Sequence, residues 1–415
     1  MRGILGNQCD IGGRSDRLDF MFEKIVLRRS ETGLGLTLGE VAEAMLFYQN
    51  VHLVLDPQSL GAIAKSLGLR ELLALVERGR LSAVYAEDML MARHNLVGTS
   101  IIKHDFITGT VSKTAKDGKG DSRRSRRARL DLILERNDRS GAEAKRLSDR
   151  FLDKIPLRKY SSDYFTPGGV HRAALASLED ADYVTEAIRR MLTYHVGFES
   201  FAENLRAEVI RLDDGKFVLN TNIDFDAGNA RRDRSLGRVT EGTLVIALLD
   251  ATADVSIASL YGGDFYTSTM NSDLVRIRFK ELLRRTGISA LQLQQFKEIV
   301  LPEYPAIREV INSGERSFKE FEELLDQSER FRAAVHQMSP DSNLVKEYFT
   351  QVLREGWISS LPAKGIRYVL GLILGAVNPI AGAAASAADT FLLDKLKGWR
   401  PNHFVDGKLR PFLDV

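Results

Sequence analysis

The pattern of hydrophobic and polar positions alternates between two periods over the first 112 residues, which predicts strands interleaved with helices. Strands are expected at 20–28, 51–56, 81–87 and, as one or two strands, within 95–112. Thr37 and Glu40 have the spacing of a capping box, and Pro57 suits the first turn of another helix. The run 68–79 predicts a third helix, which Gly79 would end. The sequence therefore predicts a mixed α/β domain.

Residues 113–129 break this pattern, because they show no apolar period and hold eight basic residues against two acidic ones. The basic residues are Lys113, Lys116, Lys119, Arg123, Arg124, Arg126, Arg127 and Arg129. We interpret the run as a linker or exposed loop, with helical sequence resuming near Leu130. Two alternatives stay open: a solvated loop, or a contact to a polyanion such as nucleic acid or anionic lipid headgroups.

The run that begins at Thr166 opens with helix-start signals and is expected to stay helical to about His195. Alternating residues around Asp214-Gly215 predict a β-hairpin. The long apolar run from Glu241 fits a helix or a pair of strands, and its length favours the helix. From Ser272 onward the chain is expected to be helical, with a second capping box at Ser317 and Glu320. The predicted class is α+β, with a mixed α/β N-terminal domain and a predominantly helical C-terminal half.

The same pattern predicts four regions along the 415 residues. They are a mixed α/β domain at 1–112, a basic linker with a charged helical segment at 113–160, a helix with a hairpin at 161–270, and a helical domain at 271–415. A formal net charge of +2 indicates no preferred partner, so only local clusters of charge are informative. The single cysteine fits a reducing cytoplasm, and the N-terminus does not resemble a secretory signal.

Two features of the N-terminal region could carry chemistry, and each has a structural alternative. Gly33, Gly35 and Gly39 precede a helix start, where free N–H groups can bind phosphate, but their spacing matches no phosphate-binding motif and favours a structural turn. Asp56 follows a strand before Pro57, so it is either a helix cap or the first ligand of a nuclease-type metal site. A metal site would need further carboxylates, which Glu40, Glu43, Glu87 and Asp88 could supply.

No other motif indicates a cofactor or a metal. The polar run Asn222, Asp224, Asp226 and Asn229 departs from the calcium-loop template and favours a turn after the hairpin. The seven histidines have no zinc spacing, and no nucleophile elbow is present. We therefore expect no cofactor and no metal, leave enzymatic activity undecided, and lean towards a non-enzymatic role.

An uncharged stretch of 21 residues, 368–388, is the most unusual feature of the chain. A continuous helix of this length would span about 31 Å, close to one bilayer core. Gly371 and Gly375 permit close helix packing, but Pro379 would break the helix, and the second half, which includes Gly382, is rich in alanine. A buried helical hairpin is favoured, with conditional insertion into a membrane and a constitutive span as the alternatives.

Two segments of the C-terminal third, INSGERSFKEFEELLD (311–326) and ADTFLLDKLKGWRPNHFV (388–405), resemble a family of uncharacterised bacterial proteins. The resemblance implies a bacterial, cytosolic origin and transfers no activity or catalytic residue. Trp399 to Pro401, with Phe404 and Phe412, is expected to form an aromatic plug after the hairpin.

These observations support two hypotheses about function. The first is a cytoplasmic interaction or effector protein, in antiviral or stress defence, with a protein partner, homo-oligomer formation, or a hairpin that acts on a membrane when triggered. The second is a nucleic-acid-binding protein or divalent-metal nuclease that uses 113–129 to contact phosphates.

Overall fold

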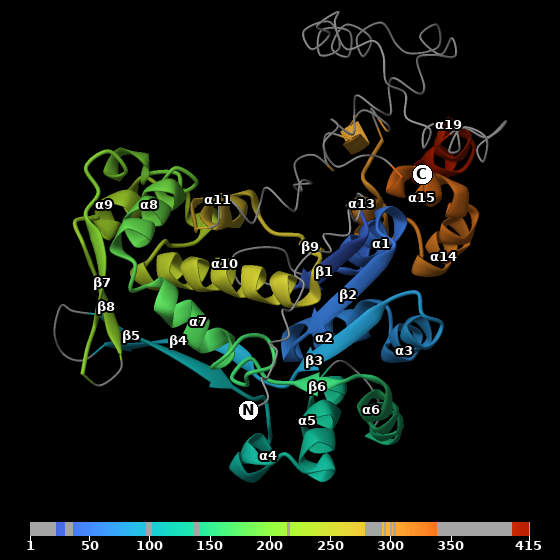
Figure 1. Ribbon diagram of the computed structural model, residues 1–415, viewed down its shortest axis with the longest axis horizontal. Helices are drawn as coiled ribbons and strands as arrows, with labels where there is room; N and C mark the ends of the chain where they lie inside the picture. Colours follow the sequence, from blue (N-terminus) through green and yellow to red (C-terminus); the bar gives the residue numbers. More distant parts are fainter. Residues whose placement is uncertain are drawn as a thin grey trace, which may run out of the picture.

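The computed structural model shows two sheets, their flanking helices, and one long helix that connects them (Figure 1). The structure describes residues 22–29, 36–96, 102–136, 141–213, 216–278, 293, 296–298, 301, 304–337 and 401–414. A parallel sheet in the N-terminal region and a mostly helical C-terminal half confirm the predicted α+β class.

The first sheet is parallel and has the strand order β6-β3-β2-β1-β9. Its strands are β1 (Lys24–Arg28), β2 (Asn50–Leu55), β3 (Ser82–Ala86), β6 (Leu157–Arg158) and β9 (Asp264–Phe265). The three long strands confirm the predictions from the apolar runs. The two short edge strands come from far along the chain, so this sheet also draws on residues beyond 112.

Successive side chains of β1 to β3 enter two different cores, because residues alternate between the faces of a sheet. One face carries Ile25 and Leu53 into the largest core, to which helices from the first 154 residues also contribute buried side chains. These are α1 (Leu38–Phe47), α2 (Pro57–Ser66), α3 (Leu69–Glu77), α5 (Arg123–Glu135) and α6 (Gly141–Lys154). The other face carries Val26, Val54 and Val84 into a small core under α10 (Glu241–Tyr261).

The predicted helix starts around the parallel sheet are confirmed. Thr37 Oγ1 accepts the N–H of Glu40 while Glu40 accepts the N–H of Thr37, which completes the capping box of α1. Asp56 caps α2, and Pro57 occupies its first turn. Gly79, with φ at +69°, follows the end of α3, where a left-handed residue suits glycine.

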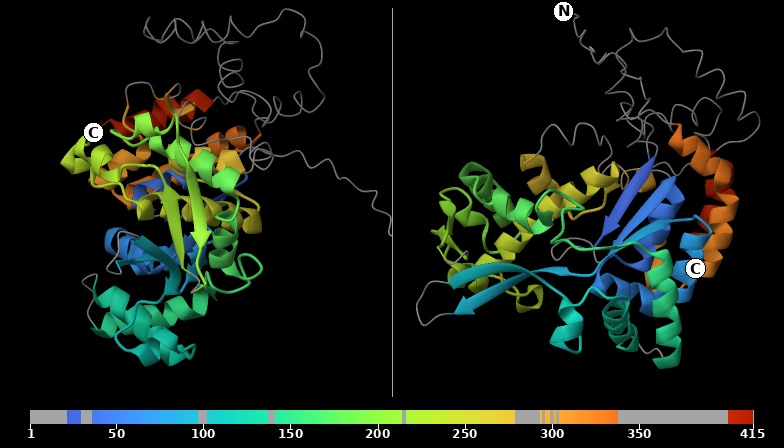
Figure 2. Two further views of the ribbon diagram at one scale, coloured as in Figure 1. Left: turned by 90° about the vertical axis from the view of Figure 1, so that its left-hand side faces the viewer. Right: turned by 60° about the horizontal axis from the view of Figure 1, so that its bottom comes forward.

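The second sheet is antiparallel and has the order β4-β5-β8-β7. Its strands are β4 (Met89–Leu96), β5 (Ile102–Gly109), β7 (Ala207–Arg211) and β8 (Phe217–Thr221). The predicted hairpin is confirmed by the pairing of β7 with β8, although Asp214 and Gly215 lie outside the described residues. Figure 2 shows the β4–β5 hairpin reaching away from the parallel sheet.

Helices cover the second sheet and form a core with it. They are α7 (Gly169–Ser177), α8 (Ala181–Leu192), α9 (Phe225–Ala230) and α11 (Thr269–Arg278), with short 3-10 turns at Glu199–Phe201 and Arg234–Leu236. The helical run that the sequence predicts up to His195 is divided in two, because Asp180 caps a new helix at Ala181. Asp224 likewise caps α9, so the polar run after the hairpin forms a helix start.

Helix α10 connects the two sheets and confirms the helix that the sequence predicts. Its N-terminal half packs Leu244 and Leu248 into the core of the antiparallel sheet, and its C-terminal half packs Ala253 and Ile257 against the parallel sheet. Among the described helices, α10 alone is long and apolar enough to cross a membrane, and 72% of its most apolar window is buried inside the protein. Core helices of this kind pass the same length and composition test, so the indication of a membrane span is weak.

The prediction of a linker or exposed loop over 113–129 is wrong. The segment forms α4 (Ala115–Lys119) and the first turns of α5. Ser122 Oγ accepts the N–H of Ser125 at 3.2 Å and caps α5, and Arg129 is buried. The five arginines are therefore helical residues, and four of them form ion pairs with carboxylates of neighbouring segments or helices. The sequence showed no apolar period here, so this role was not predicted.

The C-terminal part of the structure adds helices to the largest core. They are α13 (Ile307–Ser313), α14 (Phe318–Gln327), α15 (Glu329–His336), α19 (Pro401–Phe404), a π-helical turn (Val405–Leu409) and α20 (Arg410–Leu413). Ser317 and Glu320 form the predicted capping box, and Phe404 stacks on Phe331 with ring centroids 5.0 Å apart. The uncharged stretch 368–388, with Gly371, Gly375, Pro379 and Gly382, lies outside the described residues.

Candidate functional site

Polar side chains gather at the edge where the parallel strands end. Arg28 closes β1, Asp56 follows β2, and Glu87 and Asp88 follow β3. Parallel strands bring their carboxyl ends to one edge of the sheet, and α/β proteins commonly bind ligands there. This edge therefore contains the predicted nuclease residue Asp56 and two of its four candidate partners, Glu87 and Asp88, whereas Glu40 and Glu43 lie on α1.

Arg28 is held by two carboxylates of α10 in a buried cluster. Its Nε donates to Asp254 Oδ1 at 2.9 Å and its Nη2 to Asp250 Oδ1 at 3.2 Å. Asp250 and Asp254 lie one helical turn apart, so both reach the same guanidinium. Burial opposes the charge of Arg28, but the carboxylates outweigh it and raise the pKa of Arg28 above its ordinary value.

The second carboxylate of this cluster has an unusual proton affinity. Burial raises the pKa of Asp254 to about 6; the charge of Arg28 lowers it in part, and the charge of Asp250 adds to the rise. Thr267 Oγ1 donates to Asp254 Oδ2 at 3.3 Å. The cluster thus fastens α10 to β1.

Asp56 acts as a helix cap. Its Oδ1 accepts the N–H of Gln58 at 3.0 Å, the N–H of Ser59 at 2.7 Å and the hydroxyl of Ser59 at 2.9 Å. No group of three or more histidine, cysteine or acidic side chains within the described residues is arranged to hold a metal ion. The structure confirms the cap and lends no support to a metal site that includes Asp56.

The acids after β3 are also engaged by neighbouring segments. Glu87 forms ion pairs with Arg129 and Arg126 of α5. Asp88 accepts the N–H of Tyr160 at 2.6 Å and the hydroxyl of Ser161 at 2.7 Å. Together with the Arg28 cluster, these contacts cross-link the sheet edge to α5, to the segment after β6 and to α10.

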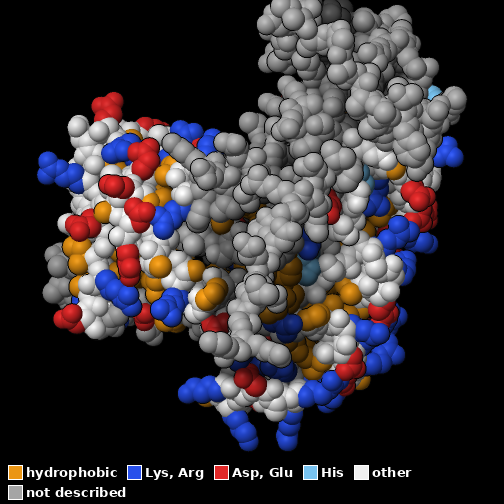
Figure 3. All heavy atoms as spheres, in the orientation of Figure 1, with side chains coloured by type: hydrophobic (Ala, Val, Ile, Leu, Met, Phe, Trp, Pro, Cys, Tyr) orange, Lys and Arg blue, Asp and Glu red, His pale blue; other side chains and the backbone are white. Residues whose placement is uncertain are grey.

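Most of the basic run is neutralised by ion pairs. Lys113 pairs with Glu135, and Arg126 and Arg129 with Glu87; Arg123 and Arg127 pair with acids of α6. Among the described residues, Lys116, Lys119 and Arg124 are exposed and form no ion pair. Figure 3 shows blue side chains along the lower rim, over α4 to α6, with red ones between them. The predicted polyanion contact remains a prediction, with three unpaired cations instead of eight.

Unfilled space lies beside the sheet edge, between the β4–β5 hairpin and two helices. This cavity of about 280 Å³, hereafter the apolar cavity, is bounded by β4, β5, α7 and α10. Its lining residues are Leu90, Met91, Phe106, Ile107, His171, Ala174, Ile246, Leu249 and Asp250. Most of them are aliphatic or aromatic, which is the usual lining of a small-molecule site.

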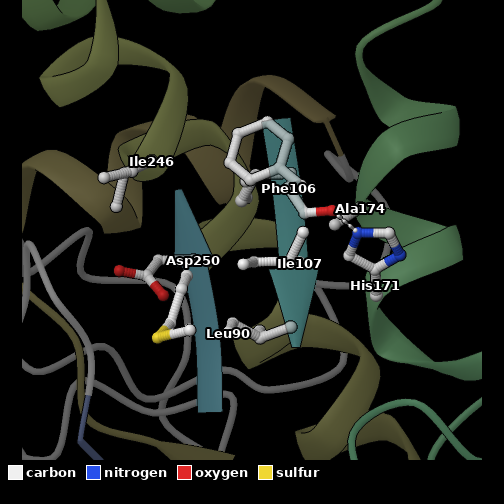
Figure 4. A pocket seen from close by; sticks show the side chains of 9 residues that line it. Leu90, Phe106, Ile107, His171, Ala174, Ile246 and Asp250 are labelled. Atoms are coloured by element: carbon white, nitrogen blue, oxygen red, sulfur yellow. Dashed lines mark hydrogen bonds between the residues drawn. The ribbon is translucent and has the colours of Figure 1, made fainter. Parts of the chain in front are cut away.

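The two polar residues of the apolar cavity face it from opposite sides (Figure 4). His171 Nε2 lies 2.6 Å from the carbonyl oxygen of Phe106, so this nitrogen carries the proton and the ring is fixed against β5. Asp250 contributes to the wall from α10 while its Oδ1 accepts from Arg28. The cavity wall and the buried Arg28 cluster thus share Asp250.

Sequence reasoning missed the apolar cavity, because its walls come from three separate parts of the chain. One signal was present: Asp250 and Asp254 are two acids one turn apart inside an otherwise apolar helix. Such a pair predicts a shared buried cation, which the structure identifies as Arg28. His171 carried no comparable signal, because its partner is a backbone carbonyl of a distant strand.

Comparison of the chain with protein families, with curated proteins and with solved structures gives no match in any of the three.

Proposed function

We propose that this chain works by binding, as an interaction or effector protein, and that a small, mainly apolar molecule in the apolar cavity controls it. The observation that carries the proposal is the cavity of about 280 Å³, whose wall helix also holds the buried Arg28 cluster. The proposal makes the cavity the sensor and α10 the element that responds.

The lining of the cavity suits an apolar ligand. Ligand sites are typically concave, mostly apolar and provided with a few polar groups that fix orientation. At about 280 Å³ the cavity lies at the small end of that class, and Asp250 and His171 mark its two sides. A molecule the size of an aromatic ring with a short polar tail matches this shape.

A ligand in the apolar cavity would act on the sheet edge through α10. Ile246, Leu249 and Asp250 contribute to the wall, and Asp250 with Asp254 of the next turn holds Arg28. A ligand that shifts this turn changes the contacts of β1, because the two are joined by buried ion pairs. Where such a packing has two discrete arrangements, small changes at a site become larger movements.

The proposal includes the output that the sequence suggests. The chain would act in the cytoplasm, through a protein partner or self-association. The uncharged stretch 368–388 would act on a membrane when triggered, in bacterial antiviral or stress defence. The uncharged stretch and the resemblance of the C-terminal third support this part of the proposal. A release assay with dye-filled vesicles of anionic lipid, with and without Gly375→Asp, tests it; no release by the wild type under any ligand contradicts it.

Nucleic-acid binding is kept as the second candidate function because Lys116, Lys119 and Arg124 are exposed cations without ion pairs in the described part of the chain. Three cations support weak binding that depends on salt. The nuclease form of this candidate has no supporting observation among the described residues, where Asp56 is a helix cap.

Binding in the apolar cavity is tested with small apolar probes and with a substitution that fills the cavity. We expect calorimetry to detect binding of indole, hexanol or decanoate to the wild type, with a negative heat-capacity change from apolar burial. Ala174→Leu places a larger side chain in the cavity and should abolish the binding, whereas Ala176→Leu, on the exposed side of α7, should leave it unchanged. Equal binding by the Ala174→Leu variant, or none of these probes binding to wild type, contradicts the proposal.

A further inference from the structure

A second cavity of about 280 Å³ lies in a different place and has a different character. It lies between α1, the start of α13 and the residues that precede α13. Figure 1 shows α1 and α13 side by side, away from α7 and the β4–β5 hairpin. Its lining residues are Glu43, Phe47, Lys297, Glu298, Leu301, Tyr304, Pro305, Ala306, Ile307, Arg308 and Glu309. We call it the charged cavity, because charged side chains of both signs line it.

Glu43 is the buried anion of the charged cavity. The residue is 3% exposed, and its Oε1 lies 2.5 Å from Lys297 Nζ. Its Oε2 is buried and, among the residues that the structure describes, has no hydrogen-bond partner. A buried carboxylate oxygen without a donor is costly, so the geometry leaves a place for a donor from outside the chain.

Lys297 pairs with Oε1 of Glu43 and does not satisfy Oε2. Burial lowers the pKa of Lys297, against the opposing pull of Glu43, and the charge of Arg308 lowers it further. Burial likewise raises the pKa of Glu40, and the charge of Arg308 offsets part of that rise. Arg308 therefore acts electrostatically on both charged neighbours of Glu43.

Arg308 is the cation that remains available. It lies exposed in the first turn of α13 and, within the described part of the chain, has no hydrogen bond or ion pair. A close helix contact fixes its backbone: a Cβ on Gly39 would lie 2.3 Å from the carbonyl oxygen of Arg308. Asn312 strengthens this contact by accepting the N–H of Gly39 at 2.9 Å. Gly39 thus serves packing between α1 and α13.

We infer that the charged cavity binds a small zwitterion of the amino-acid type. Its ammonium group would donate to Glu43 Oε2, its carboxylate would meet Arg308, and an apolar side chain would contact Phe47, Leu301 and Ile307. A lone anion would face the carboxylate of Glu43, and a lone cation would face Lys297 and Arg308. A ligand that carries both charges can pair its ammonium group with Glu43 and its carboxylate with Arg308.

Water alone is the simplest competing occupant. A water takes about 30 Å³, so one water could satisfy Glu43 Oε2 and leave most of the cavity unfilled. The apolar residues of the lining give water no partners, and a ligand with an apolar side chain uses that part of the wall. Occupation by water only is one of the outcomes of the experiment below, and it would overturn the inference.

The test uses leucine and two molecules that each lack one of its charged groups. Isopentylamine is leucine without the carboxylate, and isocaproate is leucine without the ammonium group. We expect calorimetry to show leucine binding to the full chain, with each analogue weaker by about tenfold or more, because each loses a charge-assisted hydrogen bond. No binding of leucine or other apolar amino acids, or equal binding of either analogue, overturns the inference.

Variants connect the binding to the named residues. Arg308→Gln should weaken leucine about tenfold or more and leave isopentylamine unchanged. The exposed Arg330→Gln of α15 is the matched control and should bind leucine as the wild type does. Glu43→Gln should abolish recognition of the ammonium group. If that variant fails to fold, because Lys297 loses its partner, Arg308→Gln still decides the question.

Leucine binding in the charged cavity can be tested separately from the ligand proposed for the apolar cavity. Ala174→Leu fills the apolar cavity and should leave leucine binding intact, since the two cavities share no lining residue. Loss of leucine binding in Ala174→Leu together with full binding in Arg308→Gln would place leucine in the apolar cavity and overturn the inference.

Discussion

The edge of the parallel sheet and the apolar cavity lie side by side, and they differ in what their polar groups do. At the edge, the polar groups are numerous and buried: Arg28, Glu87 and Asp88 are held by partners from other segments, and Asp56 by the start of the helix that it caps. In the apolar cavity polar groups are few, but space remains between the walls. Asp250 belongs to both regions.

This difference shows that a concentration of charged residues is a poor guide to a binding site. The sheet edge has the position and the residue types of an active site, yet its polar contacts join the chain to itself. A buried charge is tolerated when it is paired, so a fully paired cluster stabilises a fold or fixes its geometry. Free volume and unpaired atoms are the better indicators, and both cavities have at least one of them.

The strongest test of the edge removes Arg28. Arg28→Met leaves Asp250 and Asp254 buried without their cation, and we expect it to lower the free energy of unfolding by about 3–5 kcal/mol in urea titrations. The triple variant with Asp250→Leu and Asp254→Leu should recover most of that loss, because it removes the uncompensated charges.

The matched control is an exposed pair. Arg238→Met breaks an ion pair whose side chains are 72% and 93% exposed, and we expect no change beyond the error of the measurement. If Arg28→Met costs no more than Arg238→Met, the edge is not held by its ion pairs and the comparison fails.

A second test of the edge uses pH. Burial raises the pKa of Asp254 to about 6, above its unfolded value of about 3.9, so between these values the folded protein binds more protons than the unfolded chain. The contribution of Asp254 to stability is therefore present below about pH 4 and declines as the pH rises through about 6, by the order of 3 kcal/mol. Asp254→Asn should remove this slope.

The quantity to measure is the difference between wild type and variant at each pH. His52 contributes the opposite slope, because burial lowers its pKa to about 4 and its stabilising effect is lost as the pH falls. Subtracting the free energy of unfolding of the variant from that of the wild type at each pH cancels the contribution of His52. Asp226→Asn, at a side chain that is 93% exposed, is the control and should keep the wild-type slope. A slope retained in Asp254→Asn contradicts the assignment.

The same substitution should have opposite effects in the two regions. Ala86 is fully buried at the end of β3 and lines neither cavity, so Ala86→Leu should cost about 1–3 kcal/mol by overpacking. Ala174→Leu enters free volume and should be neutral or stabilise by about 0.5–1 kcal/mol. Chemical denaturation of both variants measures the contrast, and equal losses would show that the apolar cavity has no room for a larger side chain.

The sequence was sufficient for the elements whose signals are local. Neighbouring residues predicted the strands β1 to β3 and the capping boxes at Thr37 and Ser317, and the structure confirms them. They also predicted the helix that begins at Pro57, which is confirmed. The period of the chain and the chemistry of a cap are properties of a few consecutive residues. Such features need no knowledge of the tertiary fold.

The features that escaped prediction depend on partners far along the chain. The helix start at Ser122 was overlooked because its arginines look solvated, and their partners Asp149, Asp153 and Glu87 lie outside the segment. Both cavities combine walls from separate segments, so no local pattern marks them. Gly39 was interpreted as part of a turn, whereas its purpose is the approach of α13 to α1.

The smallest expected effect concerns the basic residues of α4 and α5, where the question is again whether charges are paired. If the chain binds duplex DNA, three unpaired cations release about three counterions, so log K should fall against log salt with a slope of about −3. Eight free cations would give a slope of about −7.

Two triple variants separate the unpaired cations from the paired ones. Lys116→Gln, Lys119→Gln and Arg124→Gln together should remove the binding. Arg123→Gln, Arg126→Gln and Arg127→Gln together should leave most of the affinity of the folded protein. A filter-binding titration over salt separates the two. A slope near −7, or loss of binding only in the second variant, would mean that these ion pairs open for nucleic acid, and that charges paired within the chain can also serve a partner.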